Sequence, residues 1–244
     1  MSKVLFISDL HLSEDRRDIT DCFLSFLNNT VRNQCDTLYI LGDFFEVWVG
    51  DDNLSSLNLE IAAALKSISD SGTNVFFIHG NRDFFVGEHY ALRCGMTILP
   101  EPDVITINNQ PISILHGDSL CTDDEGYMKF RRFIRHPIVK TILLSLPLFT
   151  RKWIGKKMRE SSKQSQQHKN MAIMDVNEQA VSEVFESTNT SMMIHGHTHK
   201  PFIHEATGQY LSLGRTRIVL GDWYTQGSYL SFTDGQPTLH SMKL

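Results

Sequence analysis

The sequence contains no hydrophobic run long enough to form a transmembrane helix, which takes about 20 residues. Its longest apolar stretch without a charge covers residues 141–149, and Pro147 interrupts that stretch. A secretory signal is not expected either, because Asp9 falls inside any apolar core near the N-terminus and no small-residue cleavage site follows. We therefore expect a protein with neither a membrane-spanning helix nor a secretory signal.

Cysteine is scarce, with four residues at positions 22, 35, 94 and 121. No two of them have the Cys-x-x-Cys spacing of a redox or zinc-binding motif. Unpaired thiols of this kind are typical of a reduced, cytosolic protein.

Acidic residues are almost absent from one segment, residues 129–169. This segment holds 12 of the 23 lysines and arginines and a single acid, Glu160, whereas the remainder of the chain has 11 basic and 27 acidic residues. The net charge of −5 therefore hides two regions of opposite sign. We expect the basic segment to face an anionic partner.

Apolar runs that end in polar residues recur through the chain. Residues 36–41 have the composition of a buried strand, and Gly42 and Asp43 follow at its carboxyl end. Asp43 alone could simply cap a helix. The same pattern ends four other runs, however, and in open α/β sheets ligands bind at the carboxyl ends of strands, so we expect these ends to form one site. The other four runs cover residues 4–11, 75–83, 112–118 and 192–199.

Helical periodicity separates these strands and indicates an α/β fold of two sheets packed face to face, with helices outside. Residues 1–123 and 171–244 are expected to form this core, and residues 124–170 an inserted helical cap. Residues 161–170 are polar enough either to form a mobile linker or to line a site. Helices are predicted over residues 18–32, 57–68 and 174–185, with a short helix or turn near 85–92. Further short strands are predicted over residues 97–99, 104–107, 112–115, 218–220, 229–232 and 238–240, and around Phe202.

The polar residues at the strand ends have the composition of a metal site. Carboxylate, imidazole and amide groups suit cations such as Mn²⁺, and the lack of thiolates argues against structural zinc. Seven candidate ligands are too many for one ion with open positions, whereas two ions that share Asp43 would each have four. Two cations about 3.5–4 Å apart lower the pKa of a bridging water and clamp a phosphoryl group. The candidate ligands are Asp9, His11, Asp43, Asn81, His116, His197 and His199.

The blocks that carry these residues resemble the calcineurin-like metallophosphoesterases in type and order. They are Asp9-x-His11, Gly42-Asp43, Gly80-Asn81-Arg82-Asp83, His116-Gly117-Asp118 and Gly196-His197-Thr198-His199. The resemblance implies that one metal is held by Asp9, His11, Asp43 and His199. It implies that the other is held by Asp43, Asn81, His116 and His197.

One residue departs from the pattern of that superfamily, which usually has histidine after Gly-Asn, where this chain has Arg82. Arginine does not act as a general acid at neutral pH, but its planar fork binds phosphate oxygens bidentately. A leaving group that tolerates negative charge, such as a phosphate monoester, needs no such acid. Cleavage of a pyrophosphate therefore fits better than hydrolysis of an alkyl phosphate.

Over nearly the whole chain, longer blocks resemble the UDP-2,3-diacylglucosamine diphosphatase family of bacterial lipid A biosynthesis. Two of them are residues 116–124 and 171–177. The resemblance implies hydrolysis of a pyrophosphate bond by a water activated by two Mn²⁺ ions, with UMP and 2,3-diacylglucosamine 1-phosphate as products. It also implies a peripheral location at the cytoplasmic face of the inner membrane, with a lipid-linked UDP-sugar as substrate. The residues expected to act in catalysis are Asp43, Asn81, Arg82 and His116. Substrate contacts are expected at Asn81, Arg82, Asp124, Ser162, Gln166, Lys169 and His197.

The basic segment also carries an apolar stripe at near-helical spacing. Such a stripe is ordinary core in most proteins, but a basic amphipathic segment is also typical of an interfacial membrane contact. A diacylated substrate needs an apolar slot beside a phosphate site, so we favour a lipid-binding cap in contact with an anionic membrane surface. The stripe consists of Phe130, Phe133, Ile134, Ile138, Ile142, Leu146 and Phe149.

Two other functions fit parts of the sequence. A nuclease or nucleotide phosphodiesterase would use the basic segment to follow nucleic-acid phosphates, but exposed aromatics should then lie among the charges. The aromatics of this segment have aliphatic neighbours instead, so no nucleic-acid partner is expected. A non-catalytic scaffold should have lost ligands, and no protein partner is inferred. Four further residues are left outside the predicted site. His79 and His195 directly precede two of the blocks, and strand-end packing would explain them. Asp83 and Asp118 lie within blocks, and turn capping or support of the ligands would explain them.

Overall fold

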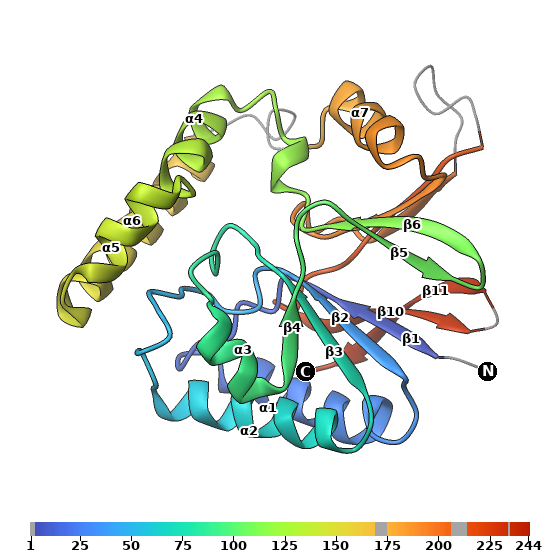
Figure 1. Ribbon diagram of the computed structural model, residues 1–244, viewed down its shortest axis with the longest axis horizontal. Helices are drawn as coiled ribbons and strands as arrows, with labels where there is room; N and C mark the ends of the chain where they lie inside the picture. The colour runs from blue at the N-terminus through green and yellow to red at the C-terminus, as the bar shows by residue number, and fades with distance from the viewer. Residues whose placement is uncertain (1–2, 169–174, 206–213, 234) are drawn as a thin grey trace.

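Two β-sheets pack face to face in the computed structural model, which describes residues 3–168, 175–205, 214–233 and 235–244 (Figure 1). The predicted α/β fold is therefore confirmed. Helices cover the outer face of each sheet, and a separate helical arm projects to one side.

The first sheet has the strand order β11-β10-β1-β2-β3-β4. Strands β1 to β4 run parallel to one another, and β10 and β11 complete the sheet in antiparallel fashion. β1 is buried along its whole length, as expected of a parallel strand covered on both faces. The strands are β1 (Val4–Ile7), β2 (Thr37–Leu41), β3 (Asn74–Ile78), β4 (Met96–Ile98), β10 (Gln226–Thr233) and β11 (Gln236–Lys243).

The second sheet has the order β5-β6-β7-β9-β8. Its three central strands are parallel, and the two edge strands are antiparallel. The strands are β5 (Asp103–Ile107), β6 (Gln110–Leu115), β7 (Met192–His195), β8 (Phe202–Glu205) and β9 (Thr216–Val219).

Three apolar layers hold the core together. One layer lies between the first sheet and the helices α1 (Arg17–Phe26), α2 (Ser56–Asp70) and α3 (Glu88–Cys94). A second fills the space between the sheets, and a third joins the second sheet to α7 (Glu178–Thr188). The helix predicted over residues 18–32 is α1, which continues as a π-helix over Leu27–Val31. The helix predicted from residue 174 begins later, at Glu178, because the Asn177 side chain accepts the first backbone N–H groups.

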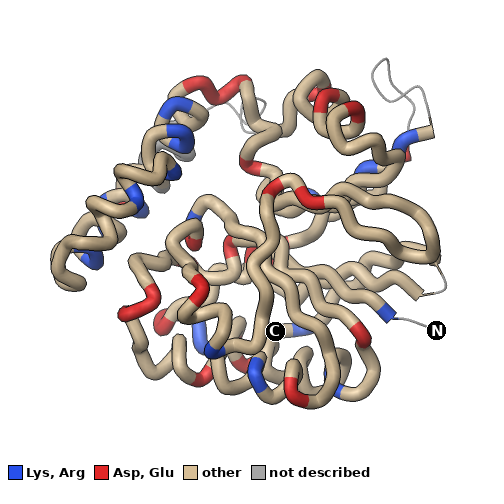
Figure 2. The backbone as a smooth tube through the Cα atoms, viewed as in Figure 1, with Lys and Arg blue, Asp and Glu red and all other residues tan. Residues whose placement is uncertain are grey.

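The basic segment forms the arm, which we call the cap. It consists of α4 (Glu125–Ile134), α5 (Pro137–Ser145) and α6 (Leu148–His168). Lysines and arginines are spread along it, whereas acids cluster in the loop that leads into α4 (Figure 2). Residues 161–168, which the sequence left open as a mobile linker or as part of a site, continue α6. None of the helices in the described part of the chain is long and apolar enough to cross a membrane.

Candidate metal centre

Five parallel strands bring the predicted ligands to one place between the two sheets. β1, β2 and β3 end next to one another in the first sheet, and β6 and β7 end next to one another in the second. Asp9 and His11 follow β1, Asp43 follows β2, and Asn81 follows β3. His116 follows β6, and His197 and His199 follow β7.

Five of these residues have left-handed backbone conformations. Their φ angles are 56° at Asp9, 52° at His11, 49° at Asp43, 69° at His197 and 57° at His199. Each such residue costs on the order of 1–3 kcal/mol, and strain of this kind collects at functional sites. A tight loop follows Gly196, because the amide of Thr198 donates to the carbonyl of Gly196 at 2.9 Å.

The first group of predicted ligands is Asp9, His11 and His199. Asp9 Oδ1 lies 3.3 Å from His199 Nε2, and the rings of His11 and His199 are 5.6 Å apart. These three residues can offer ligand atoms within 4.8 Å of one another. The other oxygen, Asp9 Oδ2, accepts from Ser8 Oγ at 2.6 Å and from the amide of His197 at 2.9 Å, which fixes the carboxylate.

The second group is Asn81, His116 and His197. His116 Nε2 lies 3.0 Å from Asn81 Oδ1, and the ring of His197 lies 5.0 Å from that of His116. Asp43 stands between the two groups, with Oδ2 at 3.8 Å from His11 Nε2 and Oδ1 at 3.7 Å from His116 Nε2. The structure thus brings all seven residues together, with Asp43 in the position that a shared ligand would need.

Two glycines allow the loops of the site to touch. Gly42 has a φ of 81°, and a Cβ atom there would lie 2.5 Å from the amide nitrogen of Gly80. A Cβ atom on Gly80 would lie 2.2 Å from the amide nitrogen and from Oδ1 of Asp43. Asp83 joins the same loops, because its carboxylate accepts from the amides of Gly80 at 2.8 Å and Phe44 at 2.7 Å. Asp83 therefore supports the ligand loops.

The donor set fits divalent cations. Asp9 Oδ1 and both ring nitrogens of His11 are buried and have no hydrogen-bond partner among the described residues. Burial lowers the pKa of His11 to about 3 and that of His197 to about 4, so both rings are neutral, as metal ligands must be. Burial opposes protonation of His116, but attraction to Asp43 and Asp9 is stronger and raises its pKa to about 9. The site therefore concentrates negative charge where a cation would bind.

Three partners of the ligands were not predicted from the sequence. Glu46 Oε2 lies 3.5 Å from His11 Nδ1, and Asp222 Oδ2 lies 3.2 Å from His199 Nδ1. Tyr224 stacks on His11 with ring centroids 5.3 Å apart. The sequence indicated a role for Glu46 only through its place in the acidic, aromatic loop after Asp43. Asp222 and Tyr224 lie in no motif.

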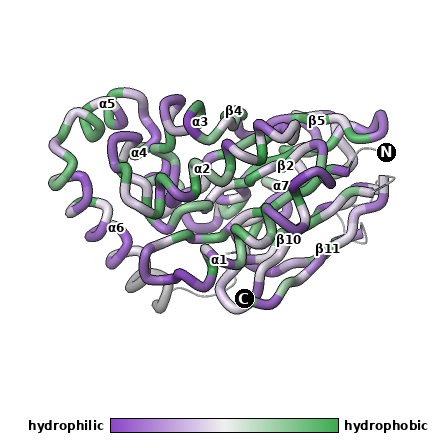
Figure 3. The backbone as a smooth tube through the Cα atoms, turned by 90° about the horizontal axis from the view of Figure 1, so that it is seen from below, coloured by the Kyte–Doolittle hydropathy of each residue, from purple (hydrophilic) through white to green (hydrophobic). Residues whose placement is uncertain are grey.

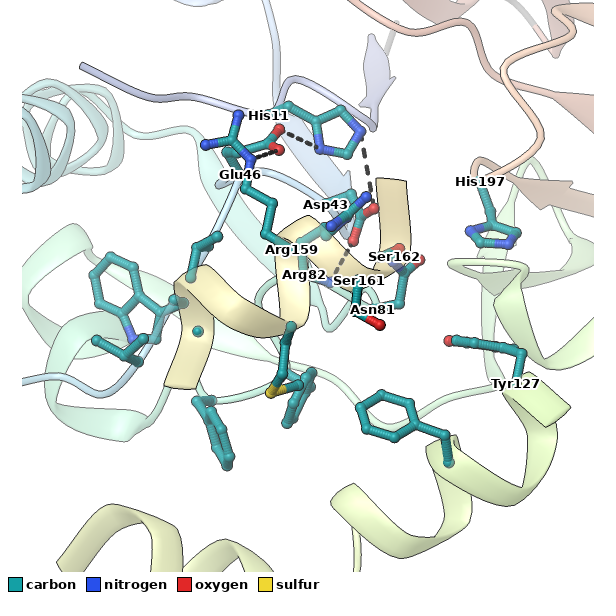
Figure 4. A pocket seen from close by; sticks show the side chains of 18 of the residues that line it. His11, Asp43, Glu46, Asn81, Arg82, Tyr127, Arg159, Ser161, Ser162 and His197 are labelled. Atoms are coloured by element: carbon teal, nitrogen blue, oxygen red, sulfur yellow. Dashed lines mark hydrogen bonds and ion pairs between the residues drawn. The ribbon is translucent and has the colours of Figure 1, made fainter. Parts of the chain in front are cut away.

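A cavity of about 1010 Å³ opens beside the predicted metal ligands. Five of the predicted substrate contacts line it, namely Asn81, Arg82, Asp124, Ser162 and His197. Asn81, Ser162 and His197 surround the same open space as Tyr127, which the sequence did not predict (Figure 4). The side chain of Gln166 and the whole of Lys169 lie outside the described residues. His79 and His195 do not line the cavity, because each ring bonds to a backbone carbonyl instead.

One side of the cavity is apolar and belongs partly to the cap. Trp48 and Phe85 face it from the core, and Phe130, Leu143, Ile154 and Met158 face it from the cap. Among the residues of the predicted stripe, only Phe130 lines this cavity. Ile134 is buried. Phe133, Ile138, Ile142 and Phe149 lie on the outer surface, so the stripe is not one continuous face.

A family model described as calcineurin-like phosphoesterase matches residues 2–201. The chain is 47% identical to the UDP-2,3-diacylglucosamine hydrolases of Escherichia coli O81 (strain ED1a) and of Shigella dysenteriae serotype 1 (strain Sd197). Each alignment covers 94% of this chain and 94% of the relative. Among solved structures, the fold is similar to that of a dimetal phosphatase from Danio rerio, with a TM-score of 0.54 and 11% identity. That match covers 99% of this chain and 96% of the other.

Proposed function

Because the chain belongs to the calcineurin-like phosphoesterase family, we propose that it hydrolyses the pyrophosphate bond of UDP-2,3-diacylglucosamine. The products would be UMP and 2,3-diacylglucosamine 1-phosphate (lipid X), a step of lipid A biosynthesis. One observation carries this proposal: a single cavity has metal ligands at one wall and an apolar surface under the cap at another. The names of relatives that are 47% identical along 94% of the chain support the same substrate.

The family has a dinuclear metal site, and we propose that two Mn²⁺ ions occupy it here. Asp9, His11, Asp43 and His199 would hold one ion, and Asp43, Asn81, His116 and His197 the other. Imidazole and oxygen ligands without thiolates favour Mn²⁺ over structural zinc. When bound, such a pair of ions lowers the pKa of a water and neutralises the charge of a phosphoryl group.

Arg82 is the residue of this chain best placed to hold the pyrophosphate. Its side chain lines the cavity, its Nε is buried without a hydrogen-bond partner in the described structure, and its backbone amide donates to Asp43 Oδ1 at 2.8 Å. Hydrolysis adds the oxygen of one water to phosphorus and breaks the bridging P–O bond, so both products leave as phosphate monoesters. Their oxygens tolerate negative charge, and an arginine that clamps them replaces a general acid.

The sugar and its chains would lie between the metal ligands and the cap. Asn81, Asp124, Ser162 and His197 offer polar contacts, and Gln166 and Lys169 stay predictions. The acyl chains would occupy the apolar side of the cavity, which a nuclease would not need. A non-catalytic scaffold is not favoured, since none of the seven predicted ligand residues is missing from the sequence.

The outer surface of the cap is suited to an anionic membrane, and we place the protein at the cytoplasmic face of the inner membrane as a peripheral protein. Ile138 is 63% exposed and Trp153 is 61% exposed, although both are large apolar residues. Lys152 and Lys156 are exposed on the same arm. Hydrophobic residues run along α5 and hydrophilic ones along α6 (Figure 3). Each basic residue near an anionic surface contributes about 1 kcal/mol, an attraction that salt screens.

Two cap variants should separate these roles. Ile154→Asn with Met158→Asn changes the cavity wall. We expect the KM for detergent-solubilised UDP-2,3-diacylglucosamine to rise about tenfold, because losing about 1.4 kcal/mol of apolar contact weakens binding by a factor of ten. Lys152→Glu with Lys156→Glu changes only the outer surface and should weaken co-sedimentation with anionic vesicles at low salt. Each variant is the control for the other. An unchanged KM in the first would contradict the acyl slot, and unchanged vesicle binding in the second would contradict the membrane contact.

A further inference from the structure

Two arginines of the cap reach into the core. Arg131 lies on α4 and Arg135 directly follows its last residue, and both contact the carboxylates of Glu101 and Asp118. Arg131 Nε donates to Asp118 Oδ2 at 2.8 Å, and its Nη2 donates to Glu101 Oε2 at 2.8 Å. Arg135 Nη1 donates to Glu101 Oε2 at 3.2 Å. We call these four residues the α4 cluster.

The α4 cluster also holds the two loops that carry metal ligands of the second group. Arg135 Nη2 donates to the carbonyl of Gly80 at 2.9 Å, directly before Asn81. Glu101 Oε1 accepts from the backbone amide of His116 at 3.0 Å. Arg135 therefore bonds directly to the backbone next to Asn81, and both arginines reach the backbone of His116 through Glu101.

The charges of the α4 cluster balance only when all four groups are present. Asp118 is fully buried, and both Arg131 and Arg135 contact its carboxylate. Removing one member of a buried ion pair leaves a charge without compensation, which is far more costly than losing a surface pair. Tyr127, which faces the cavity, also donates its hydroxyl to Asp118.

The other end of the cap is attached differently. Arg151, on α6, donates to the carbonyls of Val49 and Leu146 and pairs with Asp52. None of these three partners is a predicted metal ligand or hydrogen-bonds to the backbone of one in the described structure. Arg151 is thus a cap anchor of similar chemistry that does not touch the metal-ligand loops.

We propose that Arg131 and Arg135 are positioning residues of the metal centre. They fix the loops of Asn81 and His116, and with the same bonds they fix α4, so that the cavity wall and the second group of ligands form one rigid unit. This inference rests on the proposed function only for the identity of the metal, since no substrate enters it.

The test is calorimetric titration of metal-stripped protein with Mn²⁺. Arg135→Met should weaken the binding of one of two ions by about 10–100-fold, the usual effect of losing a group that supports metal ligands. Arg135→Lys keeps the charge but not the fork, so it should recover part of the affinity. Arg151→Met is the matched control, and it should lower the melting temperature of the metal-free protein while leaving both Mn²⁺ affinities within about twofold of the parent.

The proposal would be overturned if Arg135→Met bound both Mn²⁺ ions with parental affinity. It would also be overturned if Arg151→Met lost as much Mn²⁺ affinity as Arg135→Met. Should Arg135→Met fail to fold, Arg135→Lys must still bind one ion several-fold more weakly than the parent. If Arg135→Met lost Mn²⁺ affinity in this way but the parent protein, saturated with Mn²⁺, released no UMP from UDP-2,3-diacylglucosamine, the proposed function would be contradicted and the positioning role supported.

Discussion

Asp43→Ala is expected to abolish turnover of UDP-2,3-diacylglucosamine, even in excess Mn²⁺, while the fold persists. Asp43 is the one predicted ligand that stands between both groups, 3.8 Å from His11 Nε2 and 3.7 Å from His116 Nε2. Its removal would therefore disturb both ions. Burial raises the pKa of Asp43 to about 7, so its ionised form opposes folding of the metal-free protein at neutral pH, and its loss should not unfold the chain.

His11→Ala is the matched control, because His11 belongs to one group only. High Mn²⁺ should restore part of its activity but none of that of Asp43→Ala. Initial rates over a range of Mn²⁺ concentrations, with circular dichroism to check the fold, measure this difference. Near-normal activity in purified Asp43→Ala would show that the two-ion assignment is wrong.

Arg82→Lys should lower kcat/KM by about 100-fold, although it keeps the charge. Hydrogen bonds to a charged group contribute roughly 1.5–3 kcal/mol, and an ammonium group does not reproduce the bidentate fork. Arg82→His, which restores the residue usual in the superfamily, should be equally poor, since pyrophosphate cleavage needs a clamp rather than an acid.

Steady-state kinetics on both Arg82 variants, beside Mn²⁺ titrations, distinguish this role from a structural one. The bond from the backbone amide of residue 82 to Asp43 survives both substitutions, so Mn²⁺ affinity should stay at the parental level. An Arg82→His enzyme as active as the parent would contradict the clamp.

Much of the fold was predictable because its strands are short, apolar and bounded by turn residues. The parallel pairing of β1, β2 and β3 follows from the helices between them, and with it the convergence of Asp9, Asp43 and Asn81. The left-handed φ angles at five ligands were not predictable, because local preference opposes them and only the assembled loops impose them.

The remainder of the site depends on contacts between distant parts of the chain. Asp222 meets His199 through a long-range contact that leaves no local pattern. Glu101 lies in no motif, yet it joins the cap to the backbone of His116. Periodicity placed Ile142 in the same stripe as Phe130, but the break between α4 and α5 turns Ile142 outward and leaves Leu143 at the cavity.

The most direct test of the central claim is product release from UDP-2,3-diacylglucosamine by metal-stripped protein as Mn²⁺ is added. UDP-N-acetylglucosamine, which lacks the long acyl chains, is the comparison substrate. We predict no turnover without metal, and UMP and 2,3-diacylglucosamine 1-phosphate in equal amounts as two equivalents of Mn²⁺ bind. This UDP-sugar without long acyl chains should react at least about 100-fold more slowly, because its loss of apolar contact exceeds roughly 2.8 kcal/mol. Equal rates on the two substrates, equal rates with and without metal, or UDP as the product would contradict the account.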